Sequence, residues 1–414
     1  MKSFRIVSIL LLNLIILVSC QFFEQEDYKE VLVAKPIVMT KAEFKDSAKS
    51  IAPQPMNDSG KIYAYGDFIF INEPYQGIHV IDNSDPTNPY KVRFIKIPGS
   101  IDMSIKNNYL FADSLSDIVV LDISDINAIR PVARLEQVLN DNTPWPFEAD
   151  IVESGNVDYT SEVIVGWELA TELRKVEEVS YQLEQETLML SAVADNGTGE
   201  GGSMARFKIV DNYLYVVDSH NINVFDILDL EAPKKSSTIF AGFDIETIFN
   251  RGDELFLGSK SGMYIYDITH PETPSFISEF QHGTACDPVV VDDQYAYVTL
   301  RGGNECGATE SGLFIIDITD MKNPVQVAQY ELDGPYGLGI KDHMLFVCDG
   351  SSGLKVYDKS DVLDLKSMGH YKDILTYDVI PLESHLLMIG DKILHQYSYN
   401  DQGVSLMSSF KLTD

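Results

Sequence analysis

One short sequence phrase recurs along most of the chain, and this repetition limits the possible folds more than any other feature. In each copy, an apolar run ends in an aspartate and is followed by a polar turn rich in Ser, Thr, Asp and Pro. Three intervals between neighbouring copies measure 40 or 41 residues. A fixed period of this size predicts one supersecondary unit repeated along the chain. The phrase ends at Asp82, Asp122, Asp226, Asp267, Asp317 and Asp358, and a seventh copy at 393–398 has lost the aspartate.

Each repeat predicts four short β-strands. In the second copy, the runs 101–106, 109–112, 118–122 and 131–137 are rich in β-branched and aromatic residues, with turn residues between them. Four strands in about 40 residues are typical of a propeller blade. One blade cannot bury both of its faces alone, so neighbouring blades must stack and close into a circle. We therefore expect an all-β protein, a seven-bladed β-propeller of four-stranded blades over residues 60–414.

The aspartate that ends each phrase has a structural explanation. It lies where the third strand gives way to a turn, and we expect it to accept hydrogen bonds from backbone N–H groups there. A calcium site in each blade is the alternative, but each turn contains few carboxylates.

The repeat resembles a known family. The stretch Gly312-Leu-Phe-Ile-Ile-Asp317, followed by Asp320 and Asn323-Pro324, is similar to the LVIVD repeat. Residues 77–89 and 334–350 resemble LVIVD-repeat lipoproteins of Bacteroidota. The resemblance covers most of the chain after residue 60. It implies a β-propeller lipoprotein of the cell envelope, and it implies neither a reaction nor a ligand.

The N-terminus has the features of a lipoprotein signal peptide. Lys2 and Arg5 precede an apolar run over 6–18, which is shorter than the ~20 residues that span a bilayer. The run ends in Leu17-Val-Ser-Cys20, which resembles the lipobox of bacterial lipoproteins. The resemblance implies a signal peptide at 1–19 and acyl chains, such as palmitate, on Cys20. Two or more chains give stable anchoring, and we expect an outer-membrane lipoprotein.

Residues 20–59 are expected to form a lipidated tether and a segment that packs on the propeller. The acidic stretch 21–27 resembles the surface-export signal of Bacteroidota lipoproteins, or it is an ordinary solvated tether. Cell-surface and periplasmic locations therefore both remain open.

Charge limits the choice of partners. The chain has 63 acidic and 31 basic residues, a formal net charge of −32. Such a surface repels phosphate backbones and anionic head groups, so a nucleic-acid partner is excluded and membrane contact is expected only through the lipid. An envelope protein or a glycan remains as the partner.

A long insertion at 140–203 separates the second and third predicted blades. It contains both tryptophans of the chain, Trp145 and Trp167. Long loops often carry function, and indole rings can serve as platforms for a partner or a glycan. In the alternative interpretation, the two rings seal the insertion against the propeller.

Two cysteines are predicted to form a disulfide. Cys286 begins the first strand of the fifth repeat, and Cys306 follows its second strand, so antiparallel pairing would bring them to the same end of the blade. An oxidising envelope would favour the bond. Cys348 lies in an apolar run and is expected to be a buried free thiol.

Several polar residues fall where first strands begin, at one mouth of the expected central channel. If they point inward, the mouth suits a hydrated Ca²⁺ or a basic group of a partner; otherwise they cap strand ends and face water. The sequence indicates no other cofactor. These candidate ligand residues are Asp102, Asp244, Glu246, Asp287, Asp378, Arg206 and Tyr336.

The sequence gives no positive indication of catalysis. It contains no Gly-x-Ser-x-Gly, no His-Glu-x-x-His and no dinucleotide-binding glycine motif. We therefore favour a non-catalytic envelope lipoprotein whose propeller is a platform for protein interaction. The alternative is a surface lipoprotein that binds or processes carbohydrate, with the insertion tryptophans and the acidic channel mouth as its site. Fold alone does not decide between them.

Overall fold

The structure is a computed structural model that describes residues 28–140, 145–146, 149–153, 155–175, 190–191, 199–281, 288–302, 311–400 and 402–413. Two compact units divide the chain. The smaller unit takes its described residues from Met1–Pro36, Pro146–Asn156 and Trp167–Glu184, and the larger unit from Ile37–Trp145, Val157–Gly166 and Gln185–Asp414.

The smaller unit is built on a three-stranded sheet. Its strand order is β11–β1–β12, with β1 at Tyr28–Thr40, β11 at Ile151–Val152 and β12 at Glu162–Lys175, of which residues 37–40 and 162–166 are counted with the larger unit. The strands β1 and β11 run parallel. Ion pairs join its segments, because Glu172 contacts Lys35 at 2.5 Å and Arg174 contacts Glu153 at 2.5 Å.

The larger unit contains six four-stranded antiparallel sheets and one six-stranded sheet among its described residues. In the six-stranded sheet, four consecutive strands gain β14 at one edge and β2 at the other. Its order is β14 (Glu200–Gly201), β3 (Ile62–Tyr65), β4 (Phe68–Glu73), β5 (Gly77–Asp82), β6 (Tyr90–Lys96) and β2 (Lys49–Ile51).

The other sheets each use four strands that are consecutive in the chain. Each sheet is named below by its first strand. They are β7 (Met103–Lys106), β8 (Tyr109–Ser114), β9 (Asp117–Asp122) and β10 (Arg130–Leu135); β16 (Phe207–Val210), β17 (Tyr213–Val217), β18 (Asn221–Asp226) and β19 (Lys234–Phe240); β20 (Phe249–Arg251), β21 (Glu254–Ser259), β22 (Gly262–Asp267) and β23 (Ser275–Gln281); β24 (Val289–Val291), β25 (Tyr295–Leu300), β26 (Gly312–Asp317) and β27 (Val325–Glu331); β28 (Leu338–Lys341), β29 (Met344–Cys348), β30 (Leu354–Asp358) and β31 (Lys366–Tyr371); and β32 (Asp378–Pro381), β33 (His385–Gly390), β34 (Ile393–Asn400) and β35 (Gly403–Lys411).

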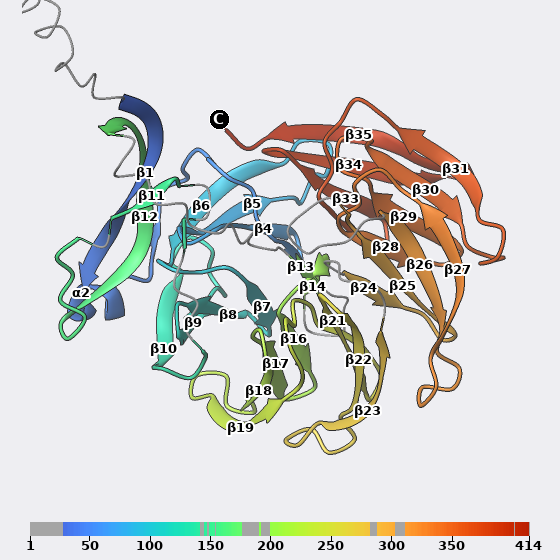
Figure 1. The fold of residues 1–414 in the computed structure, drawn as a ribbon, viewed down its shortest axis with the longest axis horizontal. Coiled ribbons are helices and arrows are strands. Elements are labelled where there is room, and N and C mark those ends of the chain that lie inside the picture. The colour runs from blue at the N-terminus through green and yellow to red at the C-terminus, as the bar shows by residue number, and fades with distance from the viewer. Residues whose placement is uncertain are drawn as a thin grey trace, which may run out of the picture. The chain divides into compact units, whose positions relative to one another are not determined.

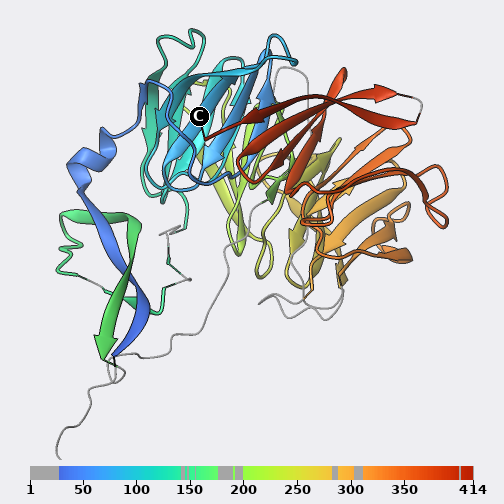
Figure 2. The same ribbon diagram turned by 90° about the horizontal axis from the view of Figure 1, so that it is seen from above.

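The sheets of the larger unit are arranged as in a β-propeller (Figures 1 and 2). The first strands contact one another in the order β3, β7, β16, β20, β24, β28 and β32, and β32 contacts β3. Apolar side chains fill the space between neighbouring sheets. Phe70 and Val80, for example, share one cluster with Leu110 and Leu121 of the next sheet. The sequence prediction of an all-β protein with propeller-type sheets is therefore confirmed.

The two ends of the ring meet without exchanging a strand. All four strands of the last sheet come from the C-terminal part of the chain. The backbone N–H of Met56 donates to the carbonyl of Leu412 at 2.9 Å. The side-chain amides of Asn83 and Gln396 form two hydrogen bonds, at 3.1 and 2.6 Å, between the first and last sheets. Packing and these bonds hold the junction.

The recurring aspartates act as predicted in their turns. Each carboxylate accepts a hydrogen bond from the backbone N–H two residues later, as Asp317 does from Thr319 at 2.9 Å. A Ser or Thr hydroxyl at the same position donates a second bond in four of the turns, as Thr319 does at 2.6 Å. The hydroxyl bond and then the N–H bond hold the pKa of Asp317 below its ordinary value. The same N–H bond recurs at Asp82, Asp122, Asp226, Asp267 and Asp358.

Two short elements complete the larger unit. The helix α2, Lys41–Lys45, has Thr40 as its N-cap, whose hydroxyl accepts from the Glu43 N–H at 3.2 Å. Strands β13 (Leu190–Ser191) and β15 (Ser203–Met204) form a two-stranded antiparallel sheet.

Candidate functional site

The centre of the ring is occupied by a segment of the protein itself. Residues 199–206, called here the central segment, begin within the last residues of the predicted insertion and run among the first strands of the sheets. Its strand β14 pairs antiparallel with β3, which places Glu200 opposite Ala64 and Gly201 opposite Tyr63. The channel mouth expected from the sequence is therefore built around this segment.

Hydrogen bonds tie the central segment to several sheets. The N–H of Gly199 donates to the carbonyl of Ile105 at 3.1 Å, and the carbonyl of Ala205 accepts from Ile248 at 2.9 Å. The Ser203 hydroxyl accepts from the Leu338 N–H at 2.6 Å. These three bonds reach the β7, β20 and β28 sheets, so one extended segment links sheets that are distant in sequence.

Asp378, at the start of β32, anchors the central segment. Its carboxylate accepts from the Ser203 N–H at 3.2 Å and from the Ser203 hydroxyl at 3.3 Å. Two glycines make room for it, because a Cβ at Gly202 or at Gly337 would lie 2.1 Å from a carboxylate oxygen. Burial raises the pKa of Asp378 from 3.8 to about 7, although these hydrogen bonds oppose the shift.

A buried charged cluster lies beside this anchor. Lys61 and Asp102 form an ion pair at 3.3 Å, and both side chains are almost fully buried. Asp102 also accepts from the Arg206 N–H at 2.5 Å. The Asp113 carboxylate accepts from the N–H groups of Ile101 and Asp102, at 2.7 and 3.0 Å.

Burial shifts the proton affinities in this cluster. It lowers the pKa of Lys61, although Asp102 opposes that change, and it raises the pKa of Asp113 from 3.8 to about 6. Shifts of this kind occur at functional sites and also in structural ion networks. Since Asp102 accepts a hydrogen bond from the Arg206 backbone, this cluster holds the end of the central segment in place.

The structure brings together three of the channel-mouth residues selected from the sequence. Arg206 is the last residue of the central segment, and its N–H donates to Asp102. Asp378 accepts from Ser203 of the same segment. Glu246 is buried and lies 4.0 Å from Lys260, whereas Asp244 is exposed. Asp287 lies outside the described residues.

Tyr336 belongs to a different group of side chains. The Arg301 guanidinium lies 4.3 Å from the centre of its ring, and the Tyr377 ring lies 5.2 Å away. No group of three or more His, Cys, Asp or Glu side chains that could hold a metal ion occurs within the described ranges.

The tryptophans and cysteines have separate places. Trp145, 44% exposed, belongs to the larger unit, and Trp167 lies in β12 of the smaller unit. Cys20, Cys286 and Cys306 lie outside the described residues, and so does the predicted disulfide. Cys348 is a buried free thiol, as expected, and burial raises its pKa. No helix in the described part of the chain is long and apolar enough to cross a membrane.

Sequence reasoning missed a second set of acids, at or just after the ends of second strands. Asp349 accepts from the N–H groups of Asp333 and Gly334, at 3.1 and 2.8 Å, and Asp218 accepts from Asn221 at 2.9 Å. Asp113 and Glu73 occupy similar positions. In the sequence, these residues are visible as an acid near the end of the second strand in four repeats. Their hydrogen-bond partners could not be predicted, because the fold brings them together.

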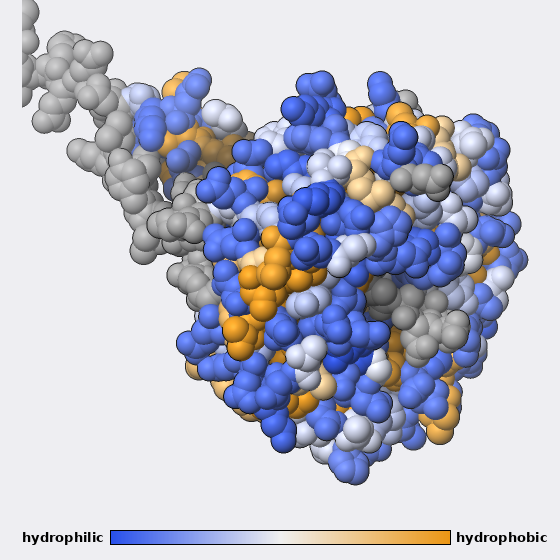
Figure 3. Space-filling view, turned by 90° about the vertical axis from the view of Figure 1, so that its right-hand side faces the viewer, coloured by the Kyte–Doolittle hydropathy of each residue, from blue (hydrophilic) through white to orange (hydrophobic). Residues whose placement is uncertain are grey.

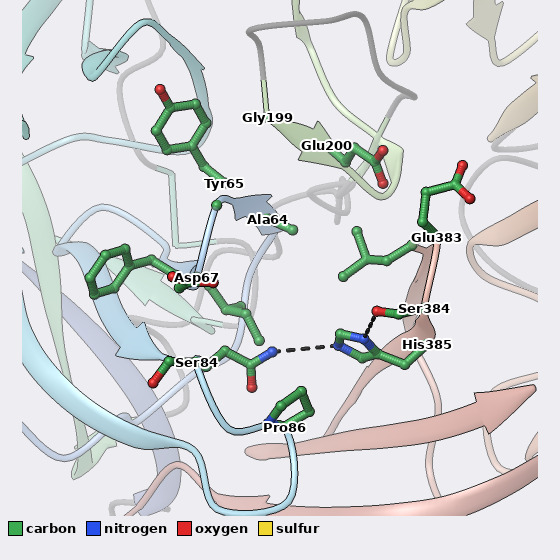
Figure 4. Close-up of a pocket in the computed structure, with 15 residues that line it drawn as sticks. Ala64, Tyr65, Asp67, Ser84, Pro86, Gly199, Glu200, Glu383, Ser384 and His385 are labelled. Carbon is green, nitrogen blue, oxygen red and sulfur yellow. Dashed lines mark hydrogen bonds between the residues drawn. The ribbon is translucent and has the colours of Figure 1, made fainter.

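A cavity of about 460 Å³ lies between the β3 and β32 sheets, beside the start of the central segment (Figure 4). His385 lies in its wall, where its Nδ1 faces the Ser384 hydroxyl at 2.9 Å and its Nε2 faces the Asn83 amide at 3.5 Å. Burial lowers the pKa of His385, which favours its neutral imidazole. Glu200 and Glu383 line the same cavity. Sequence reasoning did not select any of these residues.

Comparison with known proteins supports the class that the fold defines. The LVIVD repeat matches the chain at residues 58–93, 201–241 and 282–331. No curated protein is significantly similar in sequence. LVIVD repeats are therefore present in a chain whose structural relatives are β-propeller proteins.

Two solved structures illustrate the likeness. A functionally unknown protein from Desulfotomaculum acetoxidans has 10% identity and a TM-score of 0.51, over 86% of this chain and 97% of that one. The periplasmic gluconolactonase of Pseudomonas aeruginosa also has 10% identity and a TM-score of 0.51, over 86% of this chain and 96% of that one. At this identity the likeness concerns the fold alone.

Because the central segment packs closely against Asp378, adding one methyl group at Gly202 is predicted to destabilise the fold. Gly202→Ala should lower the free energy of unfolding by about 1–3 kcal/mol, because the new Cβ would overlap the Asp378 carboxylate. Gly334→Ala is the matched control, since no atom lies within 4 Å of its Cβ position. Urea unfolding of both variants measures the difference. Equal stability of the two variants would contradict the described packing.

The raised pKa of Asp378 predicts that the folding stability depends on pH. Its folded pKa of about 7 exceeds the unfolded value of about 4, so its contribution is most favourable below pH 4 and is lost as the pH rises through 7. Asp378→Asn removes this titration and keeps an oxygen for Ser203. The stability of this variant relative to wild type should rise between pH 5 and pH 8, measured by urea unfolding. A constant difference would show that Asp378 titrates normally.

Proposed function

We propose that the chain is a lipid-anchored, seven-bladed β-propeller of the cell envelope that acts as a non-catalytic platform for protein binding. The closed series of contacts among the first strands, from β3 around to β32 and back, supports seven blades. The lipobox-like sequence that ends at Cys20 supports the anchor. The LVIVD-repeat resemblance supports an outer-membrane lipoprotein.

The observation that carries the platform function is an exposed aromatic cluster, the Phe240–Phe243 patch, which consists of His220, Phe240 and Phe243. The two phenylalanines are 60% and 62% exposed, and their ring centres lie 5.4 Å apart. The imidazole of His220 lies 5.5 Å from the Phe243 ring. Exposed aromatic side chains that gather in this way are typical of protein interfaces.

Backbone hydrogen bonds hold the patch in one geometry. The N–H of Ala241, between the two phenylalanines in sequence, donates to the His220 carbonyl at 2.8 Å. The Ile245 N–H donates to the Ser219 carbonyl at 3.0 Å. A surface that is already ordered loses less entropy on binding.

The polarity and charge of the remaining surface indicate what kind of partner would bind. The face shown in Figure 3 is mostly hydrophilic, with an elongated apolar patch left of its centre and smaller apolar spots elsewhere. With a net charge of −32, the protein favours a partner that carries positive charge around an apolar contact.

The platform function predicts one localised contact in cells. A photo-crosslinking amino acid at position 243 of the full-length protein should capture one protein, identified by mass spectrometry. Purified partner and purified protein should then bind, and Phe240→Ser with Phe243→Ser should weaken binding at least tenfold. Phe276→Ser is the control, because Phe276 is 56% exposed on another sheet. Unchanged binding by the double variant would refute the patch as the interface.

The lipid anchor makes a separate prediction. Wild-type protein should fractionate with the outer membrane and incorporate a palmitate analogue, whereas Cys20→Ala should do neither. Protease treatment of intact cells then distinguishes a surface location from a periplasmic one. Labelling of Cys20→Ala at the wild-type level would contradict lipidation at this residue.

A further inference from the structure

Several side-chain hydrogen-bond donors in the cavity between the β3 and β32 sheets are already engaged within the protein. Ser84 donates through its hydroxyl to Asp82 at 2.6 Å, and the Tyr65 hydroxyl donates to Asn108 at 3.2 Å. His385 is paired with Ser384 and Asn83. A ligand in this cavity would therefore meet mostly acceptors.

Three carboxylates line the cavity, those of Asp67, Glu200 and Glu383, and Glu383 already accepts from the Lys341 ammonium group at 3.2 Å. The Glu200 side chain is half-buried, and among the residues that the structure describes no group donates a hydrogen bond to its carboxylate. Burial, followed by the nearby charge of Glu383, raises the pKa of Glu200. Figure 4 shows Glu200 and Glu383 on the same side of the cavity, with His385 below them. A half-buried carboxylate without a donor is stabilised by a ligand that supplies one.

The surrounding charges favour a neutral donor over a cation. Lys341 forms an ion pair with Glu383 at 3.2 Å, and the positive charges of Lys341 and Lys208 also act on Glu200. Two ammonium groups thus act on the carboxylates of Glu200 and Glu383, whereas the exposed Asp67 carboxylate also lines the cavity. A further cation would meet repulsion from both lysines, whereas a hydroxyl adds a hydrogen bond and no charge.

Apolar side chains also line the cavity. Ile69, Pro86 and Leu382 contribute to its lining. Its volume of about 460 Å³ lies in the range of small-molecule sites, roughly 300–1,000 Å³. A ligand with hydroxyl groups on one edge and C–H groups on a face complements both the polar and the apolar lining residues.

We propose that this cavity binds a neutral saccharide whose hydroxyl groups donate hydrogen bonds to the carboxylates of Glu200 and Glu383. This site is separate from the Phe240–Phe243 patch and does not depend on a protein partner. Trp145 and Trp167, the residues that the sequence suggested for a glycan, are not among the residues that line it. Because Glu200 belongs to the central segment, a bound saccharide would stabilise the start of that segment.

The test uses the full-length protein in detergent. A panel of neutral di- to tetrasaccharides of glucose, galactose, mannose and N-acetylglucosamine is screened by saturation-transfer NMR, and hits are titrated by calorimetry. At least one saccharide should bind, and Glu200→Gln should weaken it at least tenfold. Glu331→Gln, at an exposed glutamate on β27, should bind like wild type.

Two further measurements keep the test decisive. Glu383→Gln changes an exposed carboxylate, so it reports on the site even if Glu200→Gln unfolds; it should weaken binding several-fold. Spermidine tests the cationic alternative. The proposal fails if no saccharide binds, if neither variant weakens binding, or if spermidine binds at Glu200 while saccharides do not. Failure here leaves the photo-crosslinking result at position 243 unaffected.

Discussion

The larger unit depends on the pairing of the backbone N–H and C=O groups along the inner edges of the first strands. A strand edge carries unpaired N–H and C=O groups, and buried backbone groups must be paired. At the centre of the ring, β3 obtains its partners from β14, and Ile105 and Ile248 bond to Gly199 and Ala205. The central segment thus belongs to the core of the ring as much as the sheets do, although it lies outside the repeat.

The same segment explains why charged groups are buried there. Asp378 holds Ser203, and Asp102 holds the Arg206 backbone, so each carboxylate fixes a position of the segment. Burying these acids carries an electrostatic cost, which the raised pKa of Asp378 expresses. The cost is offset by hydrogen bonds, and the ion pair with Lys61 compensates Asp102. The candidate site in the cavity begins where this segment enters the ring.

The periodic features of the structure were predictable from sequence, and the features between repeats were not. Four strands per repeat and the role of Asp317 follow from local patterns that recur about every 41 residues. The insertion was visible as an excess of length, but its last residues lie in the centre because glycines fit there, as at Gly202. Glu200 and His385 are far apart in sequence and meet only when the last sheet closes on the first, so no spacing rule could pair them.

Amide hydrogen exchange of the central segment, followed by mass spectrometry in native buffer, tests this account most directly. The amides of residues 199–206 that bond to the ring should exchange as slowly as those of β3 and β16, because opening them requires the core to open. Exchange of the segment within seconds, while the strands stay protected, would show that it does not fill the centre of the ring.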